Sequence, residues 1–265
     1  MQDTSFENIV RVLTLDQTPR VWSLLISVFG DLAQEDGAQI SGPFLRKLTK
    51  VIGIKPEAMR VALHRLRKEG WIESRRQGRN SVYFLTEKGH AQTVAATPRI
   101  YATAPAASDA WLAVFNPSYP AHGVERSGAW MSSNILIAPQ PPAPCDAYVT
   151  RVDTSAEVPD WIAYKVCGGA TLGLAQDFAQ ALQTVRRHLS TSLSPLDVAV
   201  LRVLVVHGWR RIVLKTPVLP DHLFPKGWPG AQCRADVAEL LTRYPRPPLS
   251  DLEAATVSAA TPMVR

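Results

Sequence analysis

The sequence predicts an α+β protein, in which helices and strands occupy different stretches of the chain. Two observations lead to this prediction. Apolar residues recur at helical spacing before residue 70 and again after residue 172, whereas short runs of β-branched and aromatic residues lie between these parts. The chain has 265 residues, 46% of them hydrophobic, which is enough to bury one large core or two to three smaller ones.

Three helices are predicted in the first seventy residues. Residues 21–32 (VWSLLISVFGDL) are apolar on nearly every side, as in a buried helix. A second helix begins at Ser41, whose hydroxyl suits an N-cap, and ends at Gly53, as helices often end at glycine. Pro56 opens a third helix, which Gly70 terminates.

A β-hairpin is predicted directly after the third helix. Residues 71–77 (WIESRRQ) and 81–85 (SVYFL) are rich in β-branched and aromatic residues and flank the turn at 78–80 (GRN). Thr86 then suits the N-cap of another helix. Three helices followed by a hairpin is the order of a winged helix-turn-helix, a fold that places one helix in the major groove of DNA. The sequence therefore predicts this fold between Arg20 and Thr86.

Positive charge is concentrated in the same part of the chain. The whole chain has a net charge of +6 and a pI near 9.4. Residues 41–90 alone hold twelve Lys or Arg against four Asp or Glu, a net charge of +8, so the remaining residues are slightly acidic. A basic region confined to about a fifth of the chain indicates a polyanionic partner.

The third helix carries two different faces. Met59, Ala62, Leu63 and Leu66 follow the spacing i, i+3, i+4, i+7 and are expected to pack on the first two helices. The other face is basic, and arginine there suits guanine while the remaining cations suit bases or phosphates. The DNA-contacting residues predicted on this helix and on the hairpin are Arg60, Val61, His64, Arg65, Lys68, Arg75, Arg76 and Arg79.

Alternatives for single residues of this set stay open. Basic helix faces are often only solvated surfaces, and Arg65 could equally pair with Glu69 or Glu73. Arg76 could pack back onto the sheet. It is the combination of basic helix, basic hairpin and their order along the chain that favours DNA.

The rest of the chain predicts a linker, a small sheet and then helices. Residues 95–107 are rich in Ala, Thr and Pro, as linkers are. The predicted strands are 110–115, 133–138 and, more weakly, 147–152 and 161–166, and the predicted helices are 174–189, 196–207 and 233–244. The tail after Ser250 has no periodic face and predicts a frayed helix or extended chain.

The sequence predicts neither a membrane span nor a secreted protein. No stretch approaches the ~18 uncharged apolar residues that a span requires. Residues 1–20 carry acids and lack the apolar segment of a signal peptide. The three cysteines, at 145, 167 and 233, are widely spaced and predict reduced thiols in a cytoplasmic protein.

No catalytic, metal or cofactor site is predicted, so we expect a protein that is not an enzyme. Metal-assisted cleavage of a phosphodiester needs converging carboxylates, but the first predicted strand ends in Asn116-Pro117, and Asp109 lies at its other end. The six histidines show no i, i+4 pair and none lies beside a cysteine. No GxSxG or GxxxxGK[ST] motif occurs.

Several segments together resemble the PaaX family of bacterial repressors, which control phenylacetic-acid degradation. They are 22–31 (WSLLISVFGD), 59–66 (MRVALHRL), 70–71 (GW), 78–86 (GRNSVYFLT), 207–211 (HGWRR), 219–220 (LP), 223–225 (LFP) and 228–230 (WPG). The resemblance implies a winged helix-turn-helix domain at 1–97, a ferredoxin-like middle domain at 98–167 similar to small CRISPR-associated endonucleases, and a C-terminal helical domain at 168–265. It also implies a homodimeric repressor of phenylacetate catabolism genes that phenylacetyl-CoA releases from operator DNA.

An acyl-CoA effector needs basic side chains for its phosphates beside an aromatic or apolar slot. The effector-binding residues predicted on this basis are His207, Trp209, Arg210, Arg211, Lys215 and Trp228. Alternatively, the two tryptophans belong to the core and the arginines pair with Asp221 or Asp236.

Two departures from the family pattern concern the effector. Thr216-Pro217 stands where the family has Asp-Pro, and residues 126–130 (RSGAW) keep the family's pattern only loosely. A second hypothesis is therefore the same regulator with a different aromatic or acyl-CoA effector. A third is a nuclease or an enzyme acting on acyl-CoA, with the winged helix as a recruitment module.

Overall fold

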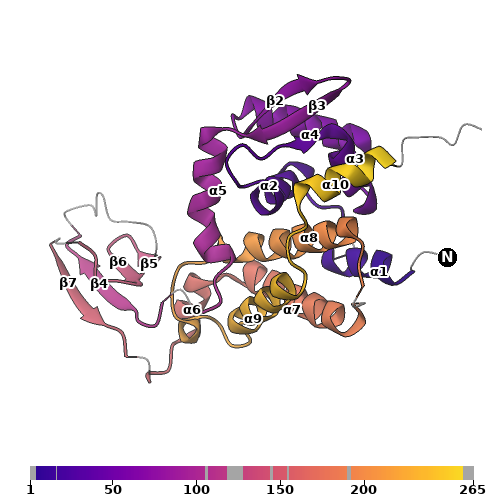
Figure 1. Ribbon diagram of the computed structural model, residues 1–265. Helices are drawn as coiled ribbons and strands as arrows, with labels where there is room; N and C mark the ends of the chain where they lie inside the picture. Colours follow the sequence, from indigo (N-terminus) through magenta and orange to yellow (C-terminus); the bar gives the residue numbers. More distant parts are fainter. Residues whose placement is uncertain are drawn as a thin grey trace, which may run out of the picture. The chain divides into compact units, whose positions relative to one another are not determined.

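The computed structural model describes residues 4–15, 17–104, 107–117, 128–143, 146–153, 155–189 and 192–258. Helices and two antiparallel sheets confirm the predicted α+β class (Figure 1). The described residues form two compact units, each built from separate stretches of the chain. Unit 1 takes residues from 1–98, 180–210 and 236–265, and unit 2 takes residues from 99–179 and 211–235.

The two units do not follow the three predicted segments one by one. The predicted segment 1–97 lies in unit 1, and nearly all of the predicted segment 98–167 lies in unit 2. The predicted segment 168–265 contributes residues to both units. The division of the chain into three domains stays a prediction.

Unit 1 starts with helices and a small sheet. Its elements are α1 (Thr4–Leu13), α2 (Val21–Leu32), β1 (Ile40–Ser41), α3 (Gly42–Val51), α4 (Pro56–Lys68), β2 (Ile72–Gln77), β3 (Asn80–Leu85) and α5 (Glu87–Ile100). The strands are antiparallel in the order β1-β3-β2, and β2 with β3 forms the predicted hairpin. The predicted succession of three helices and a hairpin is confirmed.

Local sequence signals explain where these elements begin and end. The Ser41 hydroxyl accepts a hydrogen bond from the Phe44 amide at 3.1 Å and thereby caps α3, as predicted. Gly53 and Gly70 follow α3 and α4 with φ of +83° and +71°, a conformation that glycine adopts without strain. The Thr86 hydroxyl accepts a bond from the Gly89 amide at 3.0 Å at the start of α5.

Four more helices follow: α7 (Gly169–His188), α8 (Pro195–Val213), α9 (Gly230–Arg243) and α10 (Leu249–Ser258). They confirm the three helices predicted between residues 174 and 244. The helical form of the tail, one of two alternatives, holds as far as Ser258. Residues of α7, α8 and α9 belong partly to unit 1 and partly to unit 2.

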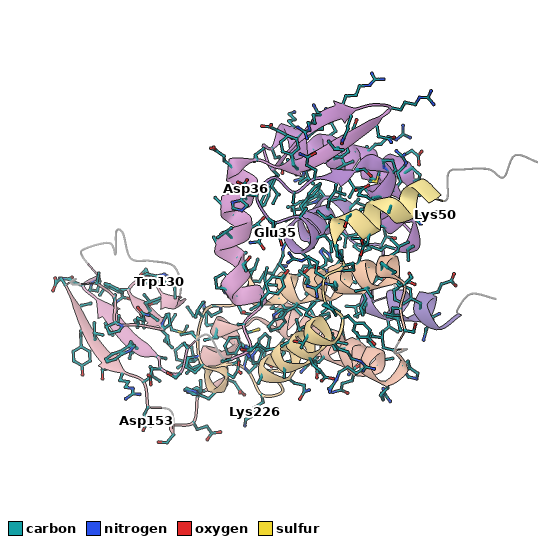
Figure 2. The ribbon with its side chains drawn as sticks, in the orientation of Figure 1. Glu35, Asp36, Lys50, Trp130, Asp153 and Lys226 are labelled. Atoms are coloured by element: carbon teal, nitrogen blue, oxygen red, sulfur yellow. The ribbon has the colours of Figure 1, made fainter. Side chains whose placement is uncertain are left out.

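The core of unit 1 is centred on α2. Leu24, Leu25, Val28 and Phe29 are completely buried, which accounts for the apolar character of this helix on nearly every side. Side chains fill the space between the helices of this unit (Figure 2). Because α2 packs on α4, the core fixes which face of α4 remains exposed.

A buried ion pair joins α2 to α8 within unit 1. The Asp31 carboxylate, completely buried, accepts bonds from Arg202 Nε at 3.0 Å and Nη2 at 2.8 Å. Arg202 Nη1 donates to the carbonyls of Leu241 at 3.0 Å and Tyr244 at 2.8 Å. All three nitrogens of the guanidinium group are therefore bonded, as a buried charge requires.

Unit 2 contains a four-stranded antiparallel sheet. Its strands are β4 (Trp111–Phe115), β5 (Ala129–Ser132), β6 (Ile135–Ala138) and β7 (Ala147–Arg151), in the order β5-β6-β4-β7. Helix α6 (Asp160–Val166) packs against β5, and the short 3-10 helix η1 (Asp221–Leu223) packs against α6. Ile137, Leu223 and Phe224 belong to the core that these elements share.

Two predicted elements are wrong. Residues 161–166 form α6 and not a strand, because Ala163 and Val166 are buried at helical spacing while Trp161 and Tyr164 are exposed. The predicted linker at 95–107 is helical in its first part, since α5 continues to the buried Ile100. Strand β5 and helix α1 were not predicted.

The described cysteines are free thiols. Cys167 and Cys233 are both buried, and burial raises the pKa of the Cys167 thiol to about 11. Cys145 lies outside the described residues. A buried thiol with a raised pKa is protonated near neutral pH and reacts slowly.

Candidate nucleic-acid interface

Helix α4 has one packed face and one exposed face. Met59, Ala62, Leu63 and Leu66 are at most 5% exposed, which confirms the predicted packing face. All predicted DNA-contacting residues of the helix are exposed, namely Arg60, Val61, His64, Arg65 and Lys68. The free surface of α4 is therefore a basic one, with a single large apolar side chain, Val61, among its exposed residues.

Two arginines of this face are held by carboxylates on the same helix or at its end. Arg60 Nη2 lies 2.9 Å from Glu57 Oε1, and both side chains are 70% exposed. Arg65 Nε lies 2.7 Å from Glu69 Oε1, so the predicted alternative for Arg65 is confirmed. Exposed ion pairs of this kind contribute only ~0–1 kcal/mol, so a phosphate or a base can replace the carboxylate.

Contacts of Glu57 at the start of α4 and of Arg65 in its second half restrict the orientation of these two side chains. A hydrogen bond from its own backbone amide, followed by the bond from Arg60, holds the pKa of Glu57 below its usual value. The Arg65 guanidinium lies 4.6 Å from the centre of the Trp22 ring of α2. Cation–π contact with Trp22 restricts the orientation of Arg65. Arg65 is thus the most constrained of the predicted contacts on α4.

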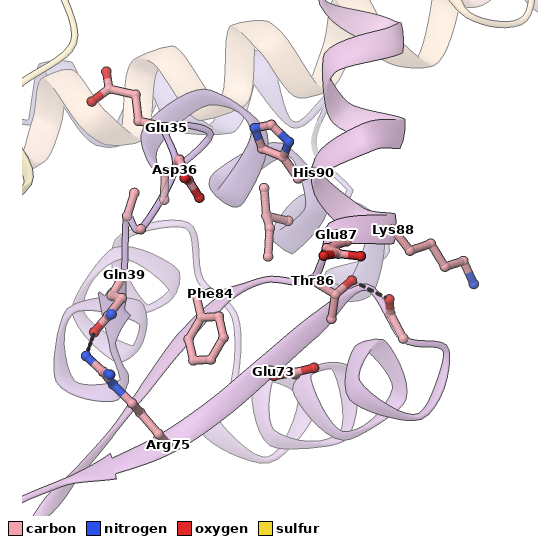
Figure 3. A pocket seen from close by; sticks show the side chains of 15 residues that line it. Glu35, Asp36, Gln39, Glu73, Arg75, Phe84, Thr86, Glu87, Lys88 and His90 are labelled. Carbon is pink, nitrogen blue, oxygen red and sulfur yellow. Dashed lines mark hydrogen bonds between the residues drawn. The ribbon is translucent and has the colours of Figure 1, made fainter.

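The hairpin presents its basic residues at its tip and on opposite faces. Arg79 is exposed in the turn beside Gly78, whose φ is +59°. Arg76 Nε donates to the Gly78 carbonyl at 3.2 Å and so bends toward the tip. Arg75 donates to the side-chain oxygen of Gln39 at 2.9 Å (Figure 3). Because neighbouring residues of a strand point to opposite faces, Arg75 and Arg76 cannot serve the same surface.

A pocket of about 700 Å³ lies on the Arg75 side of the hairpin (Figure 3). It is lined by Ala33, Glu35, Asp36, Gly37, Ala38, Gln39, Gly70, Glu73, Arg75, Phe84, Leu85, Thr86, Glu87, Lys88 and His90. Four carboxylates outnumber the basic side chains in this lining, which disfavours an anionic ligand. A bond of 2.7 Å from the Thr86 hydroxyl to the Gly70 carbonyl joins two parts of the wall.

Three of the predicted effector-binding residues pack against the rest of unit 1. His207 and Trp209 are 4% and 1% exposed. His207 Nδ1 lies 3.2 Å from the Ser27 hydroxyl, to which Arg210 also donates at 3.2 Å. Burial lowers the pKa of Arg210. Trp209 is thus a core residue, as the alternative held, and Arg210 contacts α2.

The remaining three predicted effector-binding residues lie in unit 2. Arg211 and Lys215 are exposed. Trp228 stacks on Phe224, with 4.6 Å between the ring centres, and donates to Asp221 at 3.1 Å. An effector-binding role for the six residues stays a prediction.

The two carboxylates that were the alternative partners of Arg210 and Arg211 bind other arginines. Asp221 lies 3.6 Å from Arg234, and Asp236 lies 2.6 Å from Arg186. Asp109, the acid weighed for a nuclease, accepts a bond of 3.1 Å from Arg151, which holds the pKa of this carboxyl below its usual value. Among the residues that the structure describes, no group of three His, Cys, Asp or Glu side chains is placed to hold a metal ion.

Sequence reasoning missed contacts that come from distant residues. Glu253 of α10 accepts bonds from the Ser41 amide at 2.8 Å and the Ser41 hydroxyl at 2.5 Å, and α10 packs against α3 (Figure 1). Trp22 beneath Arg65 and Gln39 beside Arg75 were equally unexpected. No local sequence pattern indicates such contacts, because each depends on how separate helices and strands pack together.

Over the described ranges, no helix has the length and apolar character to cross a membrane.

Comparisons with known proteins identify the family. A solved structure of an uncharacterized protein from Mycobacterium tuberculosis is 19% identical, with 89% of this chain and 97% of that chain covered and a TM-score of 0.48. The chain is 28% identical to "Transcriptional repressor PaaX" of Escherichia coli (strain K12), over 88% of this chain and 81% of that protein. The family descriptions "PaaX-like protein" and "PaaX-like protein C-terminal domain" match residues 20–89 and 173–247, together more than half of the chain. The chain therefore belongs to the family of PaaX-like proteins.

Proposed function

We propose that this chain is a transcriptional repressor that binds double-stranded DNA through a winged helix-turn-helix made of α2, α3, α4 and the β2–β3 hairpin. The observation that carries the proposal is the exposed basic face of α4, opposite a face that is buried on α2. Membership in the family and the name of the Escherichia coli relative support it. The protein acts in the cytoplasm, where its DNA lies.

We propose a separate role in DNA binding for each part of this interface. Helix α4 enters the major groove, where Arg60 exchanges Glu57 for the two acceptors of a guanine. His64 and Lys68 follow at one-turn intervals on the same helix and contact bases or phosphates. Arg79 at the hairpin tip enters the minor groove or holds a phosphate.

This proposal predicts salt-sensitive binding in which Arg60 and Arg79 behave differently. DNA selected by the purified chain from a randomised pool should show log K falling with log salt at a slope of about −4, as expected when four or five phosphates are neutralised. Arg60→Ala should cost ~1–3 kcal/mol and relax the base preference, whereas Arg79→Ala should weaken all sequences alike. Fluorescence anisotropy measures both. Absence of any complex at about 50 mM salt would exclude DNA binding.

The finer parts of the proposal concern assembly and control. We propose a homodimer that represses phenylacetate catabolism genes and is released from DNA by phenylacetyl-CoA. The resemblance to the PaaX family supports these parts. The middle sheet in the order β5-β6-β4-β7 supports a ferredoxin-like domain, although the described residues between β6 and β7 contain no helix.

The identity of the effector can be tested directly. Calorimetric titration with phenylacetyl-CoA, other CoA thioesters and free phenylacetate should give saturable heat with phenylacetyl-CoA, and the same compound should dissociate the DNA complex. Release by another thioester alone would replace phenylacetyl-CoA as the effector and leave the DNA-binding proposal intact. The variant Lys215→Ala tests whether an exposed cation of the predicted set contributes to binding of the CoA phosphates.

A further inference from the structure

Val61 is an apolar side chain in a place where the fold gives it no packing role. It is 70% exposed, although its neighbours Ala62 and Leu63 are buried in the core of unit 1. A β-branched residue is also a weaker helix former than the arginines beside it, Arg60 and Arg65. Neither burial nor helix propensity therefore explains valine at this position.

The position of Val61 places its methyl groups within the basic face of α4. Residues three and four apart on a helix are neighbours, so Val61 lies beside His64 and Arg65, and Arg60 precedes it. All three of these side chains are exposed and polar or charged. On the other side lies Glu57, which pairs with Arg60. An apolar group between two exposed arginines fits a partner that is polyanionic but offers a small apolar contact.

Major-groove DNA has this chemistry. Its phosphates attract the cations, and the C5-methyl of thymine is the apolar group that base edges present there. We propose that Val61 determines sequence specificity by contacting the C5-methyl group of a thymine in the bound DNA. This inference rests on the proposed function, since it requires α4 to enter the major groove.

The test removes the C5-methyl group from the DNA and, separately, the two γ-methyl groups of Val61 from the protein. DNA that the full-length chain selects from a randomised pool is resynthesised with deoxyuridine in place of each thymine in turn, which deletes the C5-methyl and keeps base pairing. At one thymine of the recognition sequence, or one in each half of a symmetric sequence, this change should weaken binding by about three- to tenfold. With Val61→Ala, the same change should have no effect, while deoxyuridine elsewhere acts as in the original chain.

A matched variant separates this contact from general effects of removing an exposed valine. Val94 of α5 is 45% exposed and lies outside α4, so Val94→Ala should leave every deoxyuridine effect unchanged. The inference is overturned if Val61→Ala retains all deoxyuridine effects, or if it weakens selected and random DNA by the same factor. If the chain selects no DNA at all, it is the proposed function that fails.

Discussion

Replacing Arg202 by leucine should lower the free energy of unfolding by about 3–5 kcal/mol, one of the largest effects expected of a single substitution in this chain. The change leaves the Asp31 carboxylate completely buried without the two nitrogens that lie 3.0 and 2.8 Å from it. It also removes the donor from the carbonyls of Leu241 and Tyr244. A buried charge without a partner costs several kcal/mol, far more than the pair contributes by itself.

Urea unfolding followed by circular dichroism measures this effect as a lower midpoint. Arg187→Leu is the matched control, because Arg187 is exposed on α7, and it should change stability by less than about 0.5 kcal/mol. A double variant, Asp31→Leu with Arg202→Leu, should recover part of the loss, since it removes both charges. Equal midpoints for Arg202→Leu and the unchanged chain would contradict the importance of the pair.

Removing three exposed cations of the interface should reduce DNA affinity by about 10²- to 10³-fold. The combined variant Arg60→Ala, Lys68→Ala and Arg79→Ala loses a base-reading side chain and two phosphate contacts, which together cost ~3–4 kcal/mol. The slope of log K against log salt should become shallower by about two, because two phosphate contacts are lost. The chain should remain folded, since all three side chains are exposed.

A second triple variant decides whether the position or the number of charges matters. Lys165, Arg187 and Lys226 are also exposed, and they lie outside residues 41–90 (Figure 2 shows Lys226). Their replacement by alanine changes the net charge by the same three units. Anisotropy titrations should show at most about a twofold loss. Similar losses for both triple variants would mean that net charge, not the α4–hairpin surface, drives binding.

The part of the fold that we propose binds DNA could be predicted because its signals are local. Ser41, Pro56 and Gly70 place the ends of α3 and α4 through bonds and backbone angles within a few residues. The spacing of buried residues then fixed the exposed face of α4. Because apolar residues recur at helical spacing along the 13 residues of α4, the sequence of this segment alone indicates both its buried face and its exposed face.

Other parts could not be predicted because a short run of apolar residues is compatible with the period of a helix and with that of a strand. In residues 161–166 (WIAYKV) the aromatic and β-branched residues matched a strand. Only the burial of Ala163 and Val166, three residues apart, indicates the helix, and Val166 belongs to the unit 2 core. The missed helix α1 is different. Phe6, Ile9 and Val10 are buried at helical spacing, so its signal was present in the sequence and was overlooked.

The predicted effector residues show a limit that no local pattern removes. A basic cluster around residue 210 matched an anion site, yet His207 and Arg210 contact Ser27, some 180 residues earlier in the chain. The sequence gives the types of these side chains but not their partners. The same limit hid the bond that the Ser41 amide donates to Glu253, 212 residues later in the chain.

The Asp31–Arg202 pair also bears on when a new chain becomes active. Asp31 leaves the ribosome 171 residues ahead of its arginine, a delay of roughly 10–30 s at ordinary rates of bacterial synthesis. Until the segment through Tyr244 has also emerged, the Asp31 carboxylate of α2 lacks its buried partner, and the helices proposed to read DNA lack their full core. A nascent or interrupted chain would therefore carry all the predicted DNA contacts and still be a poor competitor for operator sites. On the proposed function, a chain interrupted before this point would therefore repress poorly.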